Sequence, residues 1–367
     1  MRCIEIFKYL ETWAPQQIAW LKDNPGLQAG DPNAEVKNIL LCLEVTEKVV
    51  LEALNKNCNL IFTHHPLIFQ PLSKIDFNNH TSKILQSLIK NDINLYSAHT
   101  NLDFTKEGVS FKLAQKLDLT EIKFLRNLYS NQYKLSIFVP EKALEAVADA
   151  AFNSGAGVIG EYSKCSFRTE GIGTFFGNEH TNPSEGSKET FEKVNEVKLE
   201  LIVDKWKLNK VLDDVNRVHP YEEIAYDVMP LENPNVNYGA GAIGNLKNEL
   251  TEKEFLKYVL EKLNLENFRY CKGKKDKIKR VAVCGGSGSD MLNDSINNAD
   301  AFITADVKYH AFHDALGKIL LIDAGHYETE IFSLEEVQKR LQEFIKDKNI
   351  NIYQYSDSTN PIFYYKK

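Results

Sequence analysis

Side chains that can bind metal ions follow three apolar, strand-like runs of this sequence. His64 and His65 end the run NLIFTHH, and Asp103 ends the run INLYSAHTNLD. His326 follows the run KILLIDAG, and Glu330 lies four residues later. Because ligands gather beyond the carboxyl ends of the strands in an open α/β sheet, we expect the three segments to meet at one edge. Three imidazoles and two carboxylates form a mixed nitrogen and oxygen set, which suits zinc, iron, manganese or cobalt better than calcium or magnesium.

The spacing within this set favours two metal ions over one. Neighbouring side chains on a strand point to opposite sides, so His64 and His65 serve two ions, or a locally turned backbone before Pro66, more easily than a single ion. A helix over HYETEIFSLEEVQ would place His326 and Glu330 on one face, one turn apart. Since a carboxylate can bridge two ions while imidazoles complete each of them, the sequence predicts a dinuclear centre.

Other roles stay open for some of these residues. Asp103 is also placed to cap the helix FTKEGVSFKLAQKL, and Glu330 also suits the first turn of a helix. His99, four residues before Asp103, and His310, in the segment KYHAFH, are candidates for proton transfer or else for the surroundings of the ligands. The segment CGGSGSD follows a strand and precedes a helix, so its amides could hold an anion, but a tight turn is the favoured interpretation.

The elements that must position these residues change character along the chain. The first and last parts alternate strand-like and helix-like segments, which predicts parallel strands covered on both faces. The middle gives the order strand, helix, strand twice, which is typical of a ferredoxin-like domain. We therefore expect an α/β fold whose outer domain, two α/β halves with a mostly parallel sheet, carries an inserted ferredoxin-like α+β domain. The outer domain is expected at 1–130 and 241–367 and the insert at 131–240, with ENPNVNYGAGAIG as the return linker.

The composition excludes several classes of protein. A formal net charge of -7 over 367 residues argues against a general nucleic-acid binder, which needs a surplus of Lys and Arg. No apolar run approaches the length of a membrane span, and the N-terminal segment does not have the architecture of a signal peptide. The six cysteines are scattered without a C-x-x-C pair, as is usual for free thiols in a reducing compartment. We therefore expect a cytoplasmic protein.

Eight stretches of the sequence carry a family resemblance. In chain order they are DNPGLQAGDP, THHPLIF, SAHTNLD, HPYEEIAYDV, GAGAIG, CGGSGSD, TADVKYH and DAGHYETE. These stretches span nearly the whole chain and occur in the order found in the NIF-three-like family. The chain therefore resembles this family, whose members are named as GTP cyclohydrolase type 2 homologues. One departure is Ala305, where the family usually has glycine, and this position is not one of the expected ligands.

The resemblance implies an assembly and a set of ligands. Members of the family that the chain resembles form toroidal homohexamers with a dinuclear metal centre. Their long members carry an insert similar to PII and CutA proteins, with HPYEE as its recurrent motif. The resemblance therefore implies a homohexamer that binds two divalent ions per chain, zinc in the first place and iron or manganese otherwise. The implied ligands are again His64, His65, Asp103, His326 and Glu330, with Glu330 as the bridge.

The implied activity is that of a metal-dependent hydrolase acting on a small molecule. Water would add either to a nucleotide, where it opens the imidazole ring of GTP, or to a phosphoester, and the ligand set fits both reactions. His99 or His310 would transfer the proton. The alternative is a metal-binding scaffold or regulator without turnover, in which the insert binds a small ligand or a partner.

Overall fold

The computed structural model describes residues 1–365, and these divide into two compact units. The first, called the outer unit here, is discontinuous: it comprises Met1–Arg126 and the chain from Tyr238 onward. The second, called the insert, comprises Asn127–Asn237. Each boundary falls a few residues before the position expected from the sequence. No helix of the described residues has the length and apolar character needed to cross a membrane.

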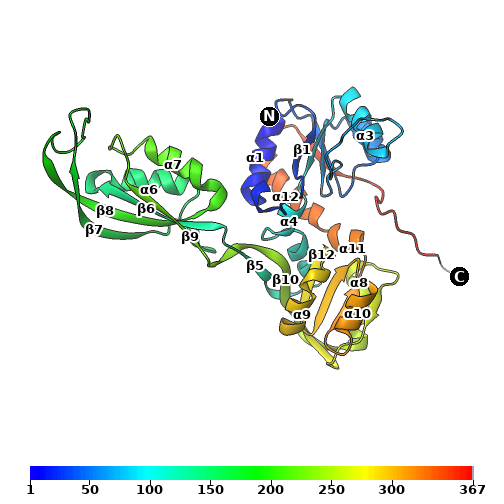
Figure 1. The fold of residues 1–367 in the computed structure, drawn as a ribbon. Coiled ribbons are helices and arrows are strands. Elements are labelled where there is room, and N and C mark those ends of the chain that lie inside the picture. The colour runs from blue at the N-terminus through cyan, green and yellow to red at the C-terminus, as the bar shows by residue number, and fades with distance from the viewer. Residues whose placement is uncertain (366–367) are drawn as a thin grey trace. The chain divides into compact units, whose positions relative to one another are not determined.

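The outer unit contains two sheets (Figure 1). Its first sheet has the strand order β1-β4-β3-β2-β15, and its strands run parallel except for the edge strand β1. The elements of this half are α1 (Cys3–Trp13), η1 (Gln16–Ile18), β1 (Gly26–Ala29), β2 (Asn38–Cys42), α2 (Glu47–Asn55), β3 (Leu60–Thr63), α3 (His80–Lys90), β4 (Asn94–Ser97), α4 (Thr100–Asp103), α5 (Val109–Lys116) and, after the second half, α12 (Ser333–Ile345) and β15 (Asn351–Gln354).

Helices cover both faces of this first sheet, which explains why its strands read as unbroken apolar runs. On β2, Ile39 and Leu41 pack in one core with residues of α1 and α12. Leu40, between them, faces the opposite core, which contains residues of α2 and α3. Successive side chains on a strand point to opposite faces, so a strand buried on both sides needs an apolar residue at every position. Thr46 caps α2 by accepting a hydrogen bond from the Val49 amide.

The second sheet is mixed, with the order β11-β14-β13-β12-β10-β5. Its strands β12, β13 and β14 are parallel, whereas β10 and β11 run antiparallel to their neighbours, so this half is less uniformly parallel than expected. The elements are β5 (Thr120–Tyr129), β10 (Pro234–Thr251), α8 (Glu252–Leu263), β11 (Arg269–Cys271), β12 (Lys277–Ser287), η4 (Ser289–Met291), α9 (Leu292–Asn298), β13 (Ala301–Ala305), α10 (Tyr309–Ala315), β14 (Leu320–Asp323) and α11 (His326–Glu330).

The expectation that ENPNVNYGAGAIG is a return linker is wrong, because most of this segment belongs to the long strand β10. Its glycines have a packing role: a Cβ added at Gly239 would lie 2.5 Å from the carbonyl oxygen of Arg126 on β5. A glycine-rich run can therefore be a strand where another backbone approaches closely, although the same composition is typical of a loop.

The insert has one four-stranded antiparallel sheet with the order β7-β8-β6-β9. Its core contains alternating residues of β6, such as Leu135 and Ile137, together with apolar residues of both helices. The elements are β6 (Gln132–Pro140), η2 (Glu141–Ala143), α6 (Leu144–Asn153), β7 (Phe167–Phe176), β8 (Phe191–Asp204), η3 (Lys205–Lys207), α7 (Leu208–Asn216) and β9 (Tyr226–Leu231). The chain thus gives strand, helix, strand twice, in the order that the sequence indicates.

Candidate metal centre

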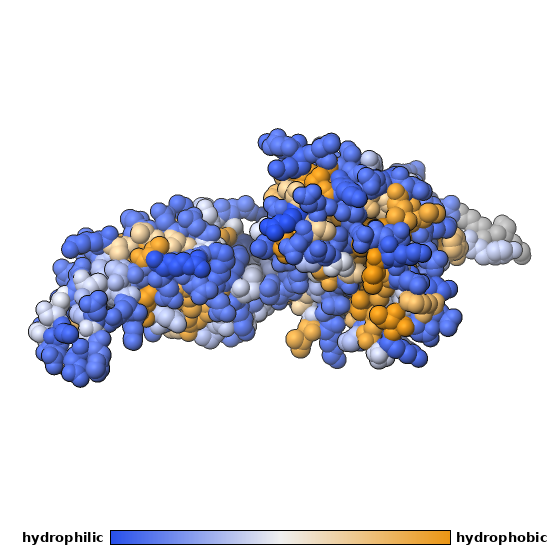
Figure 2. All heavy atoms as spheres, turned by 90° about the horizontal axis from the view of Figure 1, so that it is seen from above, coloured by the Kyte–Doolittle hydropathy of each residue, from blue (hydrophilic) through white to orange (hydrophobic). Residues whose placement is uncertain are grey.

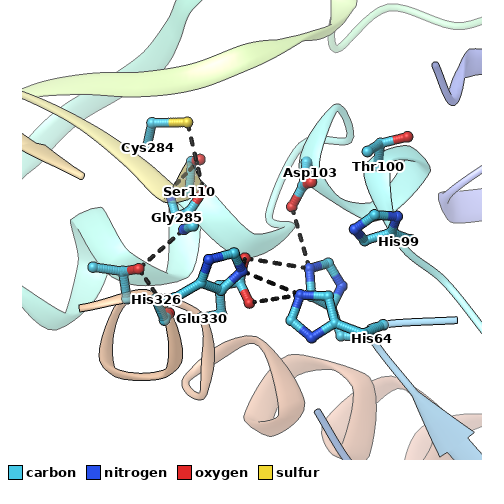
Figure 3. A network of polar contacts seen from close by, with 12 residues as sticks. His64, His99, Thr100, Asp103, Ser110, Cys284, Gly285, His326 and Glu330 are labelled. Atoms are coloured by element: carbon cyan, nitrogen blue, oxygen red, sulfur yellow. Dashed lines mark hydrogen bonds and ion pairs between the residues drawn. The ribbon is translucent and has the colours of Figure 1, made fainter. Parts of the chain in front are cut away.

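The five predicted ligands come together within the outer unit (Figure 3). His64 and His65 follow the last residue of β3, and His326 begins α11 three residues after β14 ends. The carboxylate of Glu330, at the end of α11, lies at the centre of the group. One of its oxygens is 3.1 Å from His326 Nε2 and 3.7 Å from His64 Nε2, and the other is 3.2 Å from His65 Nε2. Asp103 approaches the same ring nitrogen of His64, with Oδ1 3.6 Å from Nε2.

Each histidine of the cluster is held by its outer ring nitrogen. The Nδ1 atoms lie within hydrogen-bond distance of oxygen acceptors: His64 with the Ala98 carbonyl at 2.8 Å, His65 with Glu44 at 2.9 Å, His326 with Asp306 at 2.6 Å and His99 with Asp23 at 2.7 Å. An oxygen acceptor at Nδ1 fixes the orientation of the ring and leaves Nε2 directed toward the middle of the cluster. Metal-binding histidines are oriented in this way in most metalloproteins.

Polar atoms in the middle of the cluster lack partners that buried atoms normally have. Among the described residues, His64 Nε2 and Asp103 Oδ1 are buried without a hydrogen bond, and the buried Glu330 Oε2 has only the His65 ring beside it, with Nε2 at 3.2 Å. Leaving such atoms unpaired costs about 1–3 kcal/mol each, more for a charged group, so native proteins rarely do so without a reason. All three atoms are lone-pair donors, and cations would satisfy them. The residues present therefore fit a metal ion at this position.

The electrostatics of the cluster separate its carboxylates. Burial acts to raise the pKa of Glu330, but the charge of His64 and hydrogen bonds from His326 outweigh it and hold that pKa well below its usual range. Burial also raises the pKa of Asp103, to about 7, and here the charge of His64 opposes it only in part. The central carboxylate is therefore ionised at neutral pH, which is the form that binds a cation.

The carboxylates act on the imidazoles in turn. Burial would lower the pKa of His65, yet hydrogen bonds to Glu330 and Glu44 raise it to about 10. Burial would also lower the pKa of His326, but its contacts with Glu330 and Asp306 raise it to about 9. Without metal, these two rings hold protons at neutral pH, and a metal ion must displace those protons to reach the Nε2 atoms.

Asp103 lies on a different element from the one expected. Strand β4 ends at Ser97, six residues earlier, and the chain then forms the short helix α4, whose last residue is Asp103. Nor does Asp103 cap the following helix, because α5 begins after Gly108. The predicted helix after His326 is also divided into α11 and α12. The strand-end rule thus located the region correctly, while a single helical turn supplies the carboxylate.

His99 joins the cluster, whereas His310 does not. The ligand atoms of His64, His65 and His99 lie within 4.8 Å of one another, as do those of His65, His326 and Glu330. Asp23 holds the His99 ring and also accepts hydrogen bonds from Thr100, which with the His99 contact outweigh burial and lower its pKa to about 2. His310 is exposed on α10, and none of the hydrogen bonds or ion pairs of the described residues joins it to the cluster.

Three carboxylates that orient the rings were not singled out from the sequence. Asp23 opens the stretch DNPGLQAGDP, and Asp306 lies in TADVKYH, so both are within the stretches that carry the family resemblance. Glu44 follows β2 by two residues, at the sheet edge where β3 delivers His64 and His65. Glu44 thus follows a buried apolar strand just as His64 and His65 do, and this position is the signal that marks it in the sequence.

The glycine-rich stretch CGGSGSD supports the cluster from one side. A Cβ at Gly286, whose φ is +62°, would lie 2.2 Å from Glu330 Oε1 and 3.1 Å from His326 Nε2. The amides of this stretch donate to side-chain hydroxyls of the protein itself: Gly285 to Ser110, Gly286 to Thr329 and Gly288 to Thr304. They are therefore engaged within the fold, in agreement with the tight turn rather than the anion site.

Comparison with known proteins adds relatives of nearly equal length. The family model described as Duf34/NIF3 (NGG1p interacting factor 3) matches residues 1–361. A Bacillus subtilis protein named "GTP cyclohydrolase 1 type 2 homolog" is 38% identical over 362 residues, which cover 97% of each chain. A crystal structure of a Bacillus cereus protein related to NIF3 is 38% identical and has a TM-score of 0.87, with 100% of this chain and 99% of the other covered. A Staphylococcus aureus protein is 30% identical with a TM-score of 0.78, at the same coverage.

Proposed function

The chain belongs to the Duf34/NIF3 family, and from this premise we propose that it is a hydrolase that works with two divalent metal ions. His64 and Asp103 would bind one ion, His65 and His326 the other, and Glu330 both. The observation that supports this proposal most directly is the pair of buried, unpartnered atoms His64 Nε2 and Asp103 Oδ1 beside the central Glu330 carboxylate. Zinc suits the mixed nitrogen and oxygen set best, and iron and manganese are the alternatives.

Bound divalent ions at such a site supply Lewis acidity, which lowers the pKa of water and stabilises charge on the substrate. The protein's own residues do the rest. Glu44 and Asp306 hold the rings of His65 and His326, and Gly286 leaves room for the Glu330 carboxylate. His99 Nε2 exchanges a proton with the reacting groups while Asp23 holds the opposite nitrogen. His310 is the weaker candidate for proton exchange because of its position.

We propose a nucleotide as the substrate, in line with the names of the relatives. Water would add to the imidazole carbon of a purine nucleotide such as GTP, and the ring would open by cleavage of a carbon–nitrogen bond. Attack on a phosphoester is the second reaction that the same residues fit.

The decisive experiment is a turnover screen of the purified protein, supplemented in turn with zinc, iron and manganese, against GTP, other nucleotides and phosphoesters. We expect turnover with one of these substrates and none in His64→Ala. In His99→Gln we expect full metal content with turnover lowered about 100-fold to 10,000-fold, the usual contribution of acid–base catalysis. A protein that binds metal but turns over no substrate would be the scaffold or regulator instead.

We also propose that the chain assembles as a homohexameric ring. The outer unit exposes large apolar side chains, including Leu21, Ile75, Phe363 and Tyr365, and Figure 2 shows apolar side chains among the polar ones on the visible face. Contiguous exposed apolar surface marks association sites, and side chains such as these would supply it where they gather. A stable monomer mass in light scattering at micromolar concentration would refute the ring.

The insert is proposed to be a ferredoxin-like domain of the PII and CutA kind. Its repeated order of strand, helix, strand and its antiparallel sheet support this assignment. A domain of this type would bind a small ligand or a partner.

A further inference from the structure

We propose that the segment Ser356–Asn360, called the C-terminal strap here, holds the two halves of the metal site together, so that metal affinity depends on the intact C-terminus. Thr359 and Asn360 are the positioning residues, and they act through Glu44 and Glu328. This inference rests on the proposed function, because it assigns these residues a role toward the same metal ions.

The strap starts at the sheet edge that delivers two of the ligands. Strand β15 pairs in parallel with β2, and the Tyr355 amide continues the pairing by donating to the Leu41 carbonyl oxygen. Ser356 then bonds to Glu52 on α2, with its hydroxyl 2.6 Å from Oε2. The strap is thereby anchored to the first half of the outer unit before it reaches the metal cluster.

Thr359 completes a chain of hydrogen bonds that leads to His65. Its hydroxyl donates to one oxygen of Glu44, and the other oxygen of Glu44 lies 2.9 Å from His65 Nδ1. Both oxygens of this carboxylate are therefore engaged, one by the strap and one by the ligand ring. Without the hydroxyl, Glu44 can rotate, and the ring that it orients is less firmly fixed.

Asn360 makes the second attachment, on the other half of the site. Its side-chain amide donates to Glu328 Oε1 at 2.8 Å. Glu328 lies on α11 between His326 and Glu330, the two ligands that this helix provides. Thr359 and Asn360 are half-buried, whereas Ser356–Ser358 before them and Ile362–Tyr365 after them include mostly exposed residues. Consecutive residues of the strap thus contact the supports of ligands from both halves of the outer unit.

This bridging position decides what the strap contributes. His65 comes from the first sheet, and α11 follows the last strand of the second sheet, so their separation depends on how the two halves pack. The ions require ligand positions accurate to a few tenths of an ångström, and residues behind the ligands typically change metal affinity by about 10-fold to 100-fold. We expect the strap to act at the lower end of that range, because Glu44 and Glu328 stand between it and the ligands.

Two truncations that differ by three residues test the inference. A chain that ends after Asn360 keeps the strap, and a chain that ends after Asp357 loses both attachments. Zinc affinity is measured on each by competition with a chelating dye, alongside the full chain and Thr359→Val, which keeps the side-chain shape and removes the hydroxyl. Thermal unfolding in excess chelator shows whether each variant folds, and Ile362→Ala, at an exposed position beyond the strap, is the control.

We expect the chain ending after Asn360 and Ile362→Ala to bind zinc like the full chain. The chain ending after Asp357 should bind zinc about tenfold more weakly, and Thr359→Val should show part of that loss. Unchanged affinity in Thr359→Val and in the shorter truncation, with normal zinc binding by the full chain, overturns the role of the strap and leaves the proposed function intact. A full chain that binds none of zinc, iron and manganese overturns both.

Discussion

Histidines in the two units of this protein are buried for opposite purposes. In the insert, His219 of the HPYEE motif uses both ring nitrogens: Nε2 donates to the Phe138 carbonyl oxygen at 3.1 Å, and Nδ1 accepts from the Tyr221 amide at 3.2 Å. In the cluster of the outer unit, the Nδ1 atoms are held and the Nε2 atoms face one another and the carboxylates. The fold itself satisfies both ring nitrogens of His219, whereas it leaves polar atoms of the cluster without hydrogen bonds.

The pKa values follow the same division. Burial lowers the pKa of His219, which favours the neutral ring that its two hydrogen bonds require. Carboxylates raise the pKa values of His65 and His326. The comparison teaches that the number of buried histidines does not identify a metal site. The informative feature is polar atoms that point at one another without a neutral partner between them.

The sharpest test removes the ligands and compares them with His219. In a combined His65→Ala, Glu330→Ala variant, metal affinity should fall by more than about 100-fold, because each of the two proposed ions would lose at least one ligand. His219→Ala should leave metal content at the level of the unaltered protein. Elemental analysis after zinc, iron and manganese supplementation measures this directly. The comparison breaks down if the doubly altered protein keeps its metal or if the His219 variant loses it.

Metal binding by the cluster should weaken as the pH is lowered. In the cluster, His65 and His326 have raised pKa values of about 10 and 9, so metal binding near pH 7 must release protons. The apparent affinity should rise with pH by up to about tenfold per pH unit for each proton displaced. Manganese titrations in buffers of different ionisation enthalpy, between about pH 6.5 and 8, count the protons. Binding without proton release would contradict the charged state described for the metal-free cluster.

The stability contributions of these groups have opposite signs with pH. The raised pKa values of His65 and His326 stabilise the metal-free fold fully below the unfolded value of about 6.5, and this contribution is lost as the pH rises through 9 and 10. For His219 the lowered pKa means that the unfolded chain binds the proton more tightly, so the insert loses stability as the pH falls below about 6.5.

A smaller effect is expected from His219 itself. Its replacement by alanine leaves the Phe138 carbonyl and the Tyr221 amide without their partner, which should lower the free energy of unfolding of the insert by about 1–3 kcal/mol. Hydrogen exchange of the β6 and β9 amides in the full chain measures that loss. His180→Ala, at an exposed position of the insert, is the control and should change nothing. Equal exchange rates in both variants would assign the HPYEE histidine a role other than structural.

The smallest effect is expected from removal of the whole insert. All five proposed ligands and their orienting carboxylates lie in the outer unit, so replacing Asn127–Asn237 by a short Gly/Ser linker should leave the metal content unchanged. Strands β5 and β10 meet where the insert begins and ends, and a short linker can therefore join them. A folded deletion variant without metal would show that the insert helps to form the site.

Much of the site could be predicted from the sequence, because it depends on local patterns. Apolar runs that end in His64 and His65 or lead to His326 mark the carboxyl ends of strands, and parallel strands bring such ends to one edge. The spacing of His326 and Glu330 requires only one turn of helix, which α11 provides. The separation of a central insert also followed from a local feature, the change in the order of strands and helices.

Tertiary structure decided what the local patterns left open. Whether a glycine-rich segment is a linker or a strand depended on how closely β5 approaches Gly239. The partners of the rings, Glu44, Asp23 and Asp306, come from distant segments, and a carboxylate near a strand end looks the same in sequence whether or not it faces a histidine. The strap reaches Glu44 from 315 residues away. Sequence spacing indicates which residues can share an element, but contacts between elements are set by packing in three dimensions, which brings together residues that are far apart in the chain.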